Sequence, residues 1–370
     1  MGLEALVAKE VRNLGYECTV ENGRVTYRGD ATAIARSNMW LRTADRVKIK
    51  VGDFKATTFD QLFENTKALN WEDYLPEDAE FPVSGKSVKS ALFSVSDCQA
   101  IVKKAIVDRM KKSYKKTSWL EETGALFKIE VSLLKDIATI TIDTSGQGLH
   151  RRGYRTGQGE APMKETLAAS LVMLTNWHPD KPFIDPFTGS GTIAIEAALM
   201  GQNIAPGFNR EFVSEGWGWM DDEIWEQTRI EAEDLAKYDQ PLDISGYDID
   251  HRMVEIAKAN SIEAGLGDLI QFKQMQVKDI TSKKEYGVIV GNPPYGERLG
   301  EKRAVEQMYK DMGQAFSKLD TWSVYIITSH PEFENHYGKQ ATKKRKLFNG
   351  FIRTDYYQYW GKRPPRLQQD

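Results

Sequence analysis

The sequence predicts an α/β protein whose C-terminal half forms a mostly parallel sheet with helices on both faces, preceded by two smaller α+β units. From residue 162 onward, helical and strand-like segments alternate along the chain, which is typical of a sheet built from parallel strands. Before residue 144, two pairs of strand-like segments predict hairpins. Residues 144–159 are rich in Gly, Gln, His and Arg, which indicates a linker. We therefore expect domains at 1–55, 56–155 and 160–370.

The composition excludes several classes of protein. The 370 residues suffice for two or three domains, and no stretch approaches a membrane span. The N-terminus has no signal-peptide pattern, so we expect a cytoplasmic protein. Cys18 and Cys98 are far apart and the five histidines are scattered, so we expect no disulfide framework and no metal site.

The basic residues are clustered although the net charge is only -3. Clusters lie at 103–116, 151–155, 343–346 and 362–366. Such local patches fit contacts to phosphate groups at chosen places, although a basic run is often only a solvated face. The candidate nucleic-acid contacts are Lys103, Lys104, Arg109, Lys111, Lys112, Lys115, Arg151, Arg152 and Arg155.

The first unit is expected to be ferredoxin-like. Its expected elements are helices over 3–14 and 30–41 and strands over 17–21, 24–28 and 46–54. Gly15 is a stop signal for the first helix, and Asn22-Gly23 is a strong hairpin turn. Asp30 suits the N-cap of the second helix. A ferredoxin-like unit needs one more strand before residue 1, so that strand is expected to be missing.

Helical and strand-like segments are also expected in the second unit and in the C-terminal domain. In the second unit we expect helices over 58–69 and 96–114, an extended segment over 79–85, and strands over 126–134 and 137–143. In the C-terminal domain we expect helices over 163–177, 191–201, 252–264 and 305–319 and strands over 183–185, 244–248, 270–274, 287–291 and 323–328. A final antiparallel hairpin, 346–348 with 351–360, is expected to close the sheet around Asn349-Gly350.

The most informative motif is Asn-Pro-Pro-Tyr at 292–295. It follows the β-branched run Val288–Val290, which predicts a buried parallel strand. Two prolines force an extended exit from the sheet, which leaves the Asn292 amide oxygen and the Pro293 carbonyl free to accept hydrogen bonds. With Tyr295 as a stacking surface, this arrangement suits methyl transfer to a planar exocyclic amine. The alternative is a rigid corner that carries a surface tyrosine.

A second motif, Asp185–Thr192, joins the first strand of the C-terminal sheet to a helix. Its glycines allow the backbone to approach a ligand at a helix N-terminus, but it lacks the lysine of a phosphate-binding Walker loop. After an insertion at 206–240 that carries three tryptophans, Asp248 ends the next strand, where it could bind ribose hydroxyls. Its alternative role is a helix N-cap, which Asp250 fits better. Asp279 could accept from an adenine amine or be a plain surface residue.

In this order, the motifs resemble those of the class I S-adenosylmethionine-dependent methyltransferases. Within that class, Asp-Pro-Phe-Thr-Gly-Ser-Gly-Thr at 185–192 and Asn-Pro-Pro-Tyr-Gly-Glu-Arg-Leu at 292–299 resemble the THUMP-containing bacterial 23S rRNA guanine-N2 methyltransferases of the RlmL type. The resemblance covers nearly the whole chain and implies a ferredoxin-like piece, a THUMP RNA-binding domain and a Rossmann-like methyltransferase domain. We expect no second methyltransferase module of the kind found in some fused members of the family, so the resemblance implies the chemistry more directly than the substrate.

The resemblance also implies roles for individual residues. The implied donor contacts are Asp185, Phe187, Thr188, Gly189 and Gly191 for methionine and sulfonium, Asp248 for ribose, Ile249 and Asp279 for adenine, and, marginally, Asn292. The implied catalytic contacts to the target amine are Asn292, Pro293 and Tyr295.

We therefore expect a methyltransferase that uses S-adenosylmethionine and acts on RNA, most specifically on guanine N2 in 23S rRNA. One alternative is an amino methyltransferase for tRNA, DNA or a protein glutamine. Another is a non-catalytic RNA-binding assembly factor with an idle donor pocket. The residue that reads the base edge and the final proton acceptor are not visible in the sequence.

Overall fold

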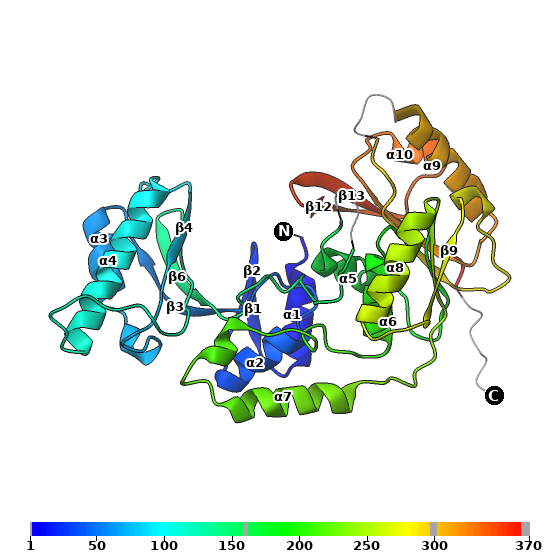
Figure 1. Ribbon diagram of the computed structural model, residues 1–370. Helices are drawn as coiled ribbons and strands as arrows, with labels where there is room; N and C mark the ends of the chain where they lie inside the picture. Colours follow the sequence, from blue (N-terminus) through cyan, green and yellow to red (C-terminus); the bar gives the residue numbers. More distant parts are fainter. Residues whose placement is uncertain (1, 158–161, 297–301, 364–370) are drawn as a thin grey trace, which may run out of the picture.

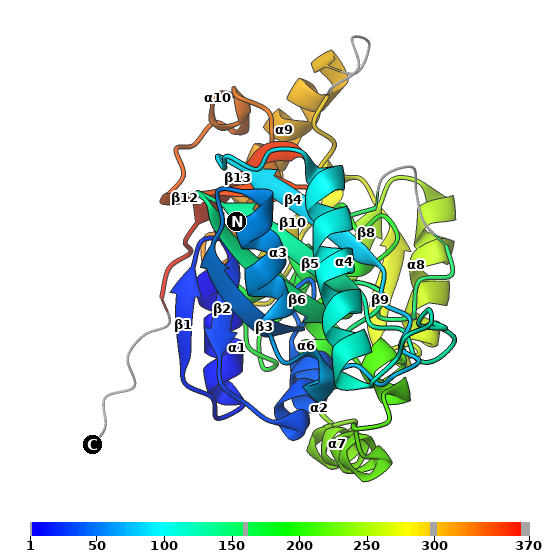
Figure 2. The ribbon, with the colours of Figure 1, turned by 90° about the vertical axis from the view of Figure 1, so that its left-hand side faces the viewer.

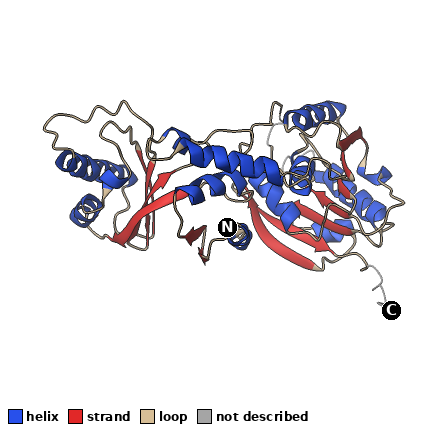
Figure 3. Ribbon diagram, turned by 90° about the horizontal axis from the view of Figure 1, so that it is seen from below, coloured by secondary structure: helices blue, strands red, loops and turns tan. Residues whose placement is uncertain are grey.

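The computed structural model describes residues 2–157, 162–296 and 302–363. The molecule is elongated, with the second unit at one end, the first unit in the middle and the C-terminal domain at the other end (Figure 1, Figure 3). Three sequence features lie partly outside the described residues: the end of the expected linker (158–159), the end of the second octet (297–299) and part of the last basic cluster (364–366).

The first unit consists of two helices and a hairpin, as expected. Its elements are α1 (Glu4–Asn13), β1 (Cys18–Glu21), β2 (Arg24–Tyr27) and α2 (Ala31–Trp40). The turn residue Gly23 has a φ of +79°, a left-handed conformation that glycine adopts without strain. Asp30 caps α2 by accepting a hydrogen bond from the Ala33 amide at 3.0 Å. Both local predictions are confirmed.

The second unit is a four-stranded sheet covered by helices. Its elements are β3 (Lys48–Lys55), α3 (Phe59–Lys67), the short 3₁₀ helix η1 (Trp71–Asp73), β4 (Val83–Val88), α4 (Val95–Ser113), β5 (Ile129–Leu134) and β6 (Ile137–Asp143). The strand order is β3-β6-β5-β4, with β4 parallel to β5 and the other pairs antiparallel. Seen from this end of the molecule, α3 and α4 lie in front of the sheet (Figure 2).

The position of β3 corrects one prediction. We expected this strand to complete the first unit, but it pairs with β6, from Lys48 opposite Asp143 to Lys55 opposite Ile137. The hairpin of β1 and β2 forms a separate two-stranded sheet. Strand β3 therefore connects the first unit to the second through its backbone.

The C-terminal domain is a seven-stranded sheet with the expected topology. Its strands are β7 (Phe183–Asp185), β8 (Ile244–Asp248), β9 (Ile270–Gln274), β10 (Val288–Gly291), β11 (Ser323–Thr328), β12 (Lys343–Asn349) and β13 (Ile352–Tyr359). Its helices are α5 (Glu165–Met173), α6 (Thr192–Gly201), α7 (Asp222–Leu235), α8 (His251–Glu263), α9 (Lys302–Phe316) and α10 (Phe333–Tyr337), with 3₁₀ turns η2 (Val213–Gly216) and η3 (Val277–Asp279). The order is β12-β13-β11-β10-β7-β8-β9. Only the two pairs that involve β13 are antiparallel, so the predicted closing hairpin is confirmed.

Both faces of this sheet are buried, which explains the continuous apolar run in β10. Val288 and Val290 face a core that includes residues of α5, α6 and α8, whereas Ile289 faces a core that includes α9 and α10. Successive side chains of a strand point to opposite faces, so a strand covered on both sides needs apolar residues at every position. This packing fixes the strands whose ends carry the motifs.

The insertion between α6 and β8 packs against the front units. Its helix α7 contacts α2, where Arg36 and Glu231 form an ion pair at 2.8 Å. Trp217 stacks on Phe127 with ring centroids 4.5 Å apart. The sequence prediction noted the tryptophans of the insertion but missed α7, and it also missed the short helix α10. Within the described ranges, no helix is both long and apolar enough to cross a membrane.

Candidate active site

The predicted motifs meet at one edge of the C-terminal sheet. Strand β7 is parallel to β8 on one side and to β10 on the other, so the ends that carry Asp185, Asp248 and Asn292 point the same way. From β7 the chain continues to β8 and β9 on one side and then returns to β10 on the other side of β7, so the strand order reverses at β7. Open α/β sheets bind ligands at such a reversal point.

The loop after β7 has the conformation that its glycines predict. Gly189 and Gly191 have φ values of +50° and +87°, in the left-handed region. A Cβ atom on Gly189 would point into open space, whereas one on Gly191 would press on Ala257 and Ile195. Gly191 is the N-cap of α6, so the N-terminus of this helix faces the loop. These features form a cradle for a ligand at a helix N-terminus.

Two buried polar atoms in this loop lack a partner. Asp185 is fully buried, and its Oδ1 accepts a hydrogen bond from the Phe187 amide at 3.2 Å. Its Oδ2 and the Thr188 hydroxyl have no hydrogen-bond partner within the described ranges. Burial raises the pKa of Asp185 to about 7, against the opposing effects of the Phe187 amide and of the Thr188 hydroxyl, which lies near the carboxylate but outside hydrogen-bond geometry. Unpaired buried polar groups are costly, so these atoms fit a ligand that supplies positive charge and donors.

The sequence left open which of Asp248 and Asp250 caps the helix and which is free to contact a ribose. Asp250 caps α8 by accepting from the Arg252 amide at 2.9 Å. Asp248 instead accepts from the Gly189 amide and the Asp250 amide, each at 2.9 Å. Each carboxylate oxygen keeps a further lone pair, which leaves Asp248 able to accept from hydroxyl groups. Asp248 thus also holds the glycine loop in place.

The remaining predicted donor contacts lie around the same edge. Phe187 is half-buried against the α9 side of the sheet. Ile249 is 66% exposed directly after β8, and Asp279 is exposed at the end of η3. The backbone carbonyl of Ile249 accepts from the Gln274 side chain at 2.8 Å, which joins the ends of β8 and β9.

The Asn-Pro-Pro-Tyr segment is anchored differently from the expectation. We expected a free Asn292 oxygen, but the Tyr295 hydroxyl donates to Asn292 Oδ1 at 2.8 Å. Tyr295 therefore folds back over Asn292. Its hydroxyl also accepts from the Asn349 side chain at 3.1 Å, and the buried Tyr309 donates to the Pro294 carbonyl at 2.9 Å. Pro293 is buried, so the corner is rigid while one lone pair of Asn292 Oδ1 stays available.

The predicted RNA contacts split into two groups. Lys104, Lys112, Lys115 and Arg151 are exposed, and Lys111 lies 5.4 Å from the Trp119 ring centroid. By contrast, Lys103 pairs with Glu122 at 2.7 Å. Arg109 hydrogen-bonds to Glu72 and holds the pKa of that carboxyl at about 2.

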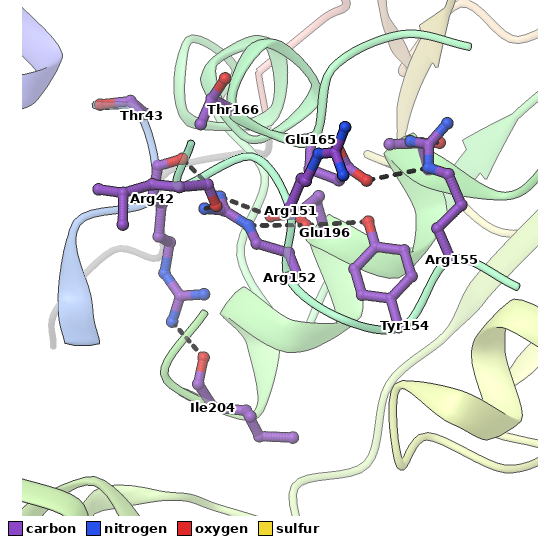
Figure 4. Close-up of polar contacts among 12 residues, drawn as sticks. Arg42, Thr43, Arg151, Arg152, Tyr154, Arg155, Glu165, Thr166, Glu196 and Ile204 are labelled. Carbon is purple, nitrogen blue, oxygen red and sulfur yellow. Dashed lines mark hydrogen bonds and ion pairs between the residues drawn. The ribbon is translucent and has the colours of Figure 1, made fainter. Parts of the chain in front are cut away.

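Arg152 and Arg155 are part of the interior, which corrects their expected role. Arg152 is 3% exposed and contacts both oxygens of the fully buried Glu196 at 3.4 Å (Figure 4). It also donates to the backbone carbonyls of Leu149 and Arg42. Arg155 pairs with Glu165 at 2.9 Å. A guanidinium held in this way is not available to a phosphate group, so both residues stabilise the fold in this structure.

Two further residues support the glycine loop, and the sequence analysis missed both functions. Arg155 donates to Thr192, the first residue of α6, at 3.1 Å. Asn260 donates to the Ser190 carbonyl at 2.9 Å and accepts from the Thr156 amide at 2.9 Å. Asn260 thereby ties the linker to the loop. A lone asparagine within a helix carries no sequence signal for this contact.

Among the described residues, Glu306, His330 and His336 bring potential metal-ligand atoms within 4.8 Å of one another. His330 Nδ1 accepts from the Glu332 amide at 3.2 Å, so its neutral ring carries the proton on Nε2. That Nε2 lies 3.9 Å from Glu306, and His336 Nε2 lies 3.6 Å from the same oxygen. At these separations neither histidine makes a hydrogen bond to Glu306.

Comparisons with known proteins agree with this arrangement. Residues 152–358 match the RMKL-like methyltransferase domain family, residues 1–48 match the RlmL ferredoxin-like domain, and residues 56–143 match the THUMP domain. The chain belongs to the RlmL-type methyltransferases. A Bacillus subtilis protein named "Putative RNA methyltransferase YpsC" is 70% identical over 100% of this chain and 97% of its own length.

Two solved structures place the family fold over the whole chain. One, from Listeria monocytogenes, is described as a predicted N6-adenine-specific DNA methylase. It is 66% identical, covers 98% of this chain and 94% of its own, and has a TM-score of 0.94. The other, SMU.472, is described as a putative methyltransferase complexed with SAH. It is 52% identical, covers 98% of this chain and 97% of its own, and also has a TM-score of 0.94. This RlmL-type protein is therefore a methyltransferase that uses S-adenosylmethionine.

Proposed function

We propose that the protein transfers a methyl group from S-adenosylmethionine to an exocyclic amine of a base in RNA, with guanine N2 in cytoplasmic 23S rRNA as the specific target. The observation that carries the proposal is the pairing of β10 with β7, which brings Asn292 to the same sheet edge as the glycine loop. Bound in that loop, S-adenosylmethionine supplies an electrophilic methyl group on a positively charged sulfur.

Each part of the site then has a distinct task. Asp185 and Thr188 offer the unpaired oxygens, and Asp248 offers its remaining lone pairs to the ribose. Asn292 Oδ1 and the Pro293 carbonyl accept from the target amine, and these hydrogen bonds strengthen as the nitrogen becomes positive. Tyr295 presents its ring to the base once its hydroxyl shares or releases Asn292 Oδ1. Catalysis is mainly positioning in this scheme.

The substrate assignment rests on the front units and the relatives. The second unit matches the THUMP domain and carries the exposed cations Lys104, Lys112 and Lys115. The Bacillus relative is named an RNA methyltransferase, whereas the Listeria relative is described as a DNA methylase. Guanine is preferred on the family resemblance, because Asn292 and Pro293 could bind any exocyclic amine. Methylation of tRNA, DNA or a protein glutamine, and a non-catalytic assembly role, are the competing outcomes.

Nucleoside mass spectrometry of ribosomal RNA from cells with and without the gene tests the proposal. We expect one N2-methylguanosine of the large-subunit RNA to disappear in the deletion strain and to return when the gene is restored. An unchanged ribosomal profile together with a lost modification in tRNA, DNA or protein would replace the proposed substrate. If the modifications of ribosomal RNA, tRNA, DNA and protein are all unchanged, the result would favour a non-catalytic role in assembly.

A further inference from the structure

The turn between β12 and β13 lies at the same sheet edge as the catalytic corner. Strand β13 is antiparallel to β11, and its beginning pairs with the end of β11, with Thr328 opposite Asp355. Strand β11 is parallel to its neighbour β10, which leads into Asn292. The sheet topology therefore brings the hairpin turn, residues 349–352, to the carboxyl ends of the parallel strands.

A chain of hydrogen bonds connects this turn to the catalytic corner. The Asn349 side chain donates to the Tyr295 hydroxyl at 3.1 Å, and that hydroxyl donates to Asn292 Oδ1 at 2.8 Å. The hairpin is also held on its other side, because Arg345 donates to the backbone carbonyl of Gly2. In Figure 1 the hairpin lies on the side of the C-terminal domain nearest the N-terminus. The turn is thus held in place beside the catalytic corner.

The turn exposes one phenylalanine completely and two apolar neighbours in part. Phe351 has a relative exposure of 104%, and its neighbours Phe348 and Ile352 are 41% and 38% exposed. Phe348 shares a face of the hairpin with Arg353, whereas Ile352 lies with Asn349 on the other face, and Phe351 stands in the turn between the two strands. A fully exposed phenylalanine adds nothing to the core, so this turn is suited to a ligand with a flat apolar face.

Basic residues outnumber acidic ones around this turn. In strand β12, Lys344 is paired with Glu334 at 2.8 Å, and Lys346 stands opposite Asp355 with its amine 5.7 Å from the Phe348 ring centroid. Arg353 is exposed and stands opposite Phe348 in the β12–β13 pair. An aromatic side chain flanked by cations is the usual surface for single-stranded nucleic acid, since bases stack and phosphates pair with the charges.

We propose that the β12–β13 turn is an RNA-binding site: Phe351 stacks on a nucleotide adjacent to the flipped target base, while Lys346 and Arg353 contact the flanking phosphates. This inference rests on the proposed function, because it takes RNA as the substrate. It adds a contact on the methyltransferase domain itself, separate from the cations of α4. The turn thereby sets which unpaired nucleotide can reach Asn292.

The test compares single-residue variants in single-turnover methylation of ribosomal RNA from a deletion strain, with saturating S-adenosylmethionine. Phe351→Ala should weaken RNA binding and slow methylation by roughly tenfold, which is the order of one lost base stack. Phe351→Trp should retain activity, because it keeps a stacking face. Donor affinity and melting temperature should not change in either variant, since Phe351 touches neither the donor loop nor the core.

Trp360 provides a matched control. It is an exposed aromatic residue, 54% exposed, directly after the opposite end of β13. Trp360→Ala should leave binding and rate within about twofold of wild type, as most surface changes do. Equal activity of Phe351→Ala and wild type on RNA would overturn the turn as a binding site while leaving the proposed function intact. Absence of RNA methylation by the wild-type protein would overturn both.

Discussion

Replacing Arg152 with alanine should destabilise the protein strongly. Arg152 and Glu196 have side chains that are 2% and 0% exposed, and they form an ion pair at 3.4 Å. The alanine variant leaves the Glu196 carboxylate buried, with the Tyr154 hydroxyl at 3.0 Å as its remaining hydrogen-bond donor. It also removes the donors to the carbonyls of Leu149 and Arg42.

The size of the expected loss in unfolding free energy depends on the other buried charges around Arg152. Three further buried charged groups lie near Arg152 and Glu196, namely Arg42, Glu10 and Glu165. Burial lowers the pKa of Arg42 to about 10 and raises that of Glu10, so the environment already disfavours charge. Removing one member of a buried ion pair costs roughly 3–5 kcal/mol of unfolding free energy.

The adjacent Arg151 is the control, because it is exposed. Denaturant unfolding followed by tryptophan fluorescence should give Arg151→Ala a free energy of unfolding within about 0.5 kcal/mol of wild type. Arg152→Ala should be lower by roughly 3–5 kcal/mol. If Arg152→Ala unfolds like wild type and instead loses RNA affinity, its assignment to the interior is wrong and the phosphate contact is right.

Three further predictions concern the donor, the catalytic corner and RNA capture. Bound donor is positively charged and favours ionised Asp185, whose pKa is raised to about 7. Donor affinity measured by calorimetry should therefore fall as pH drops below about 7 and level off above it, and Asp185→Asn should remove this dependence. The same shift means that Asp185 stabilises the free protein most at low pH, and that this contribution is lost as pH rises through about 7. Asn292→Ala should slow single-turnover methylation at least ~10²-fold while donor affinity stays near wild type, and a near-normal rate would exclude the catalytic role. Replacing Lys111, Lys112 and Lys115 should weaken RNA binding for all sequences and reduce the salt slope by about one per lost contact, whereas unchanged binding would mean that α4 is only a solvated face.

Local sequence signals predicted the elements of the fold well, because each depends on nearby residues. Asn22-Gly23 indicates a hairpin turn, and Val288–Val290 indicates a strand that is buried on both faces. Both signals are independent of distant residues. The partner of β3 was predicted wrongly because β6 is distant in sequence, and many pairings satisfy the same pattern. Alternating apolar residues show that a strand exists and leave its neighbour open.

The candidate site was predictable where chemistry depends on residue type and strand order, as for the glycine loop. It was not predictable where the outcome depends on burial. Arg151 and Arg152 are adjacent and identical in type, yet one is exposed and the other enters the core with Glu196. Nor does the sequence show that Tyr295 folds back on Asn292 or that Asn260 holds the loop, since both contacts arise from packing.

In vitro methyl transfer tests the central claim most directly. Ribosomal RNA from a deletion strain is incubated with labelled S-adenosylmethionine and either the wild-type protein or Asn292→Ala, and the labelled nucleoside is identified after digestion. The account predicts labelled N2-methylguanosine with the wild-type protein and a signal at least ~10²-fold slower with the variant. Label in another nucleoside would contradict the choice of guanine, and equal labelling by Asn292→Ala would contradict the catalytic site itself.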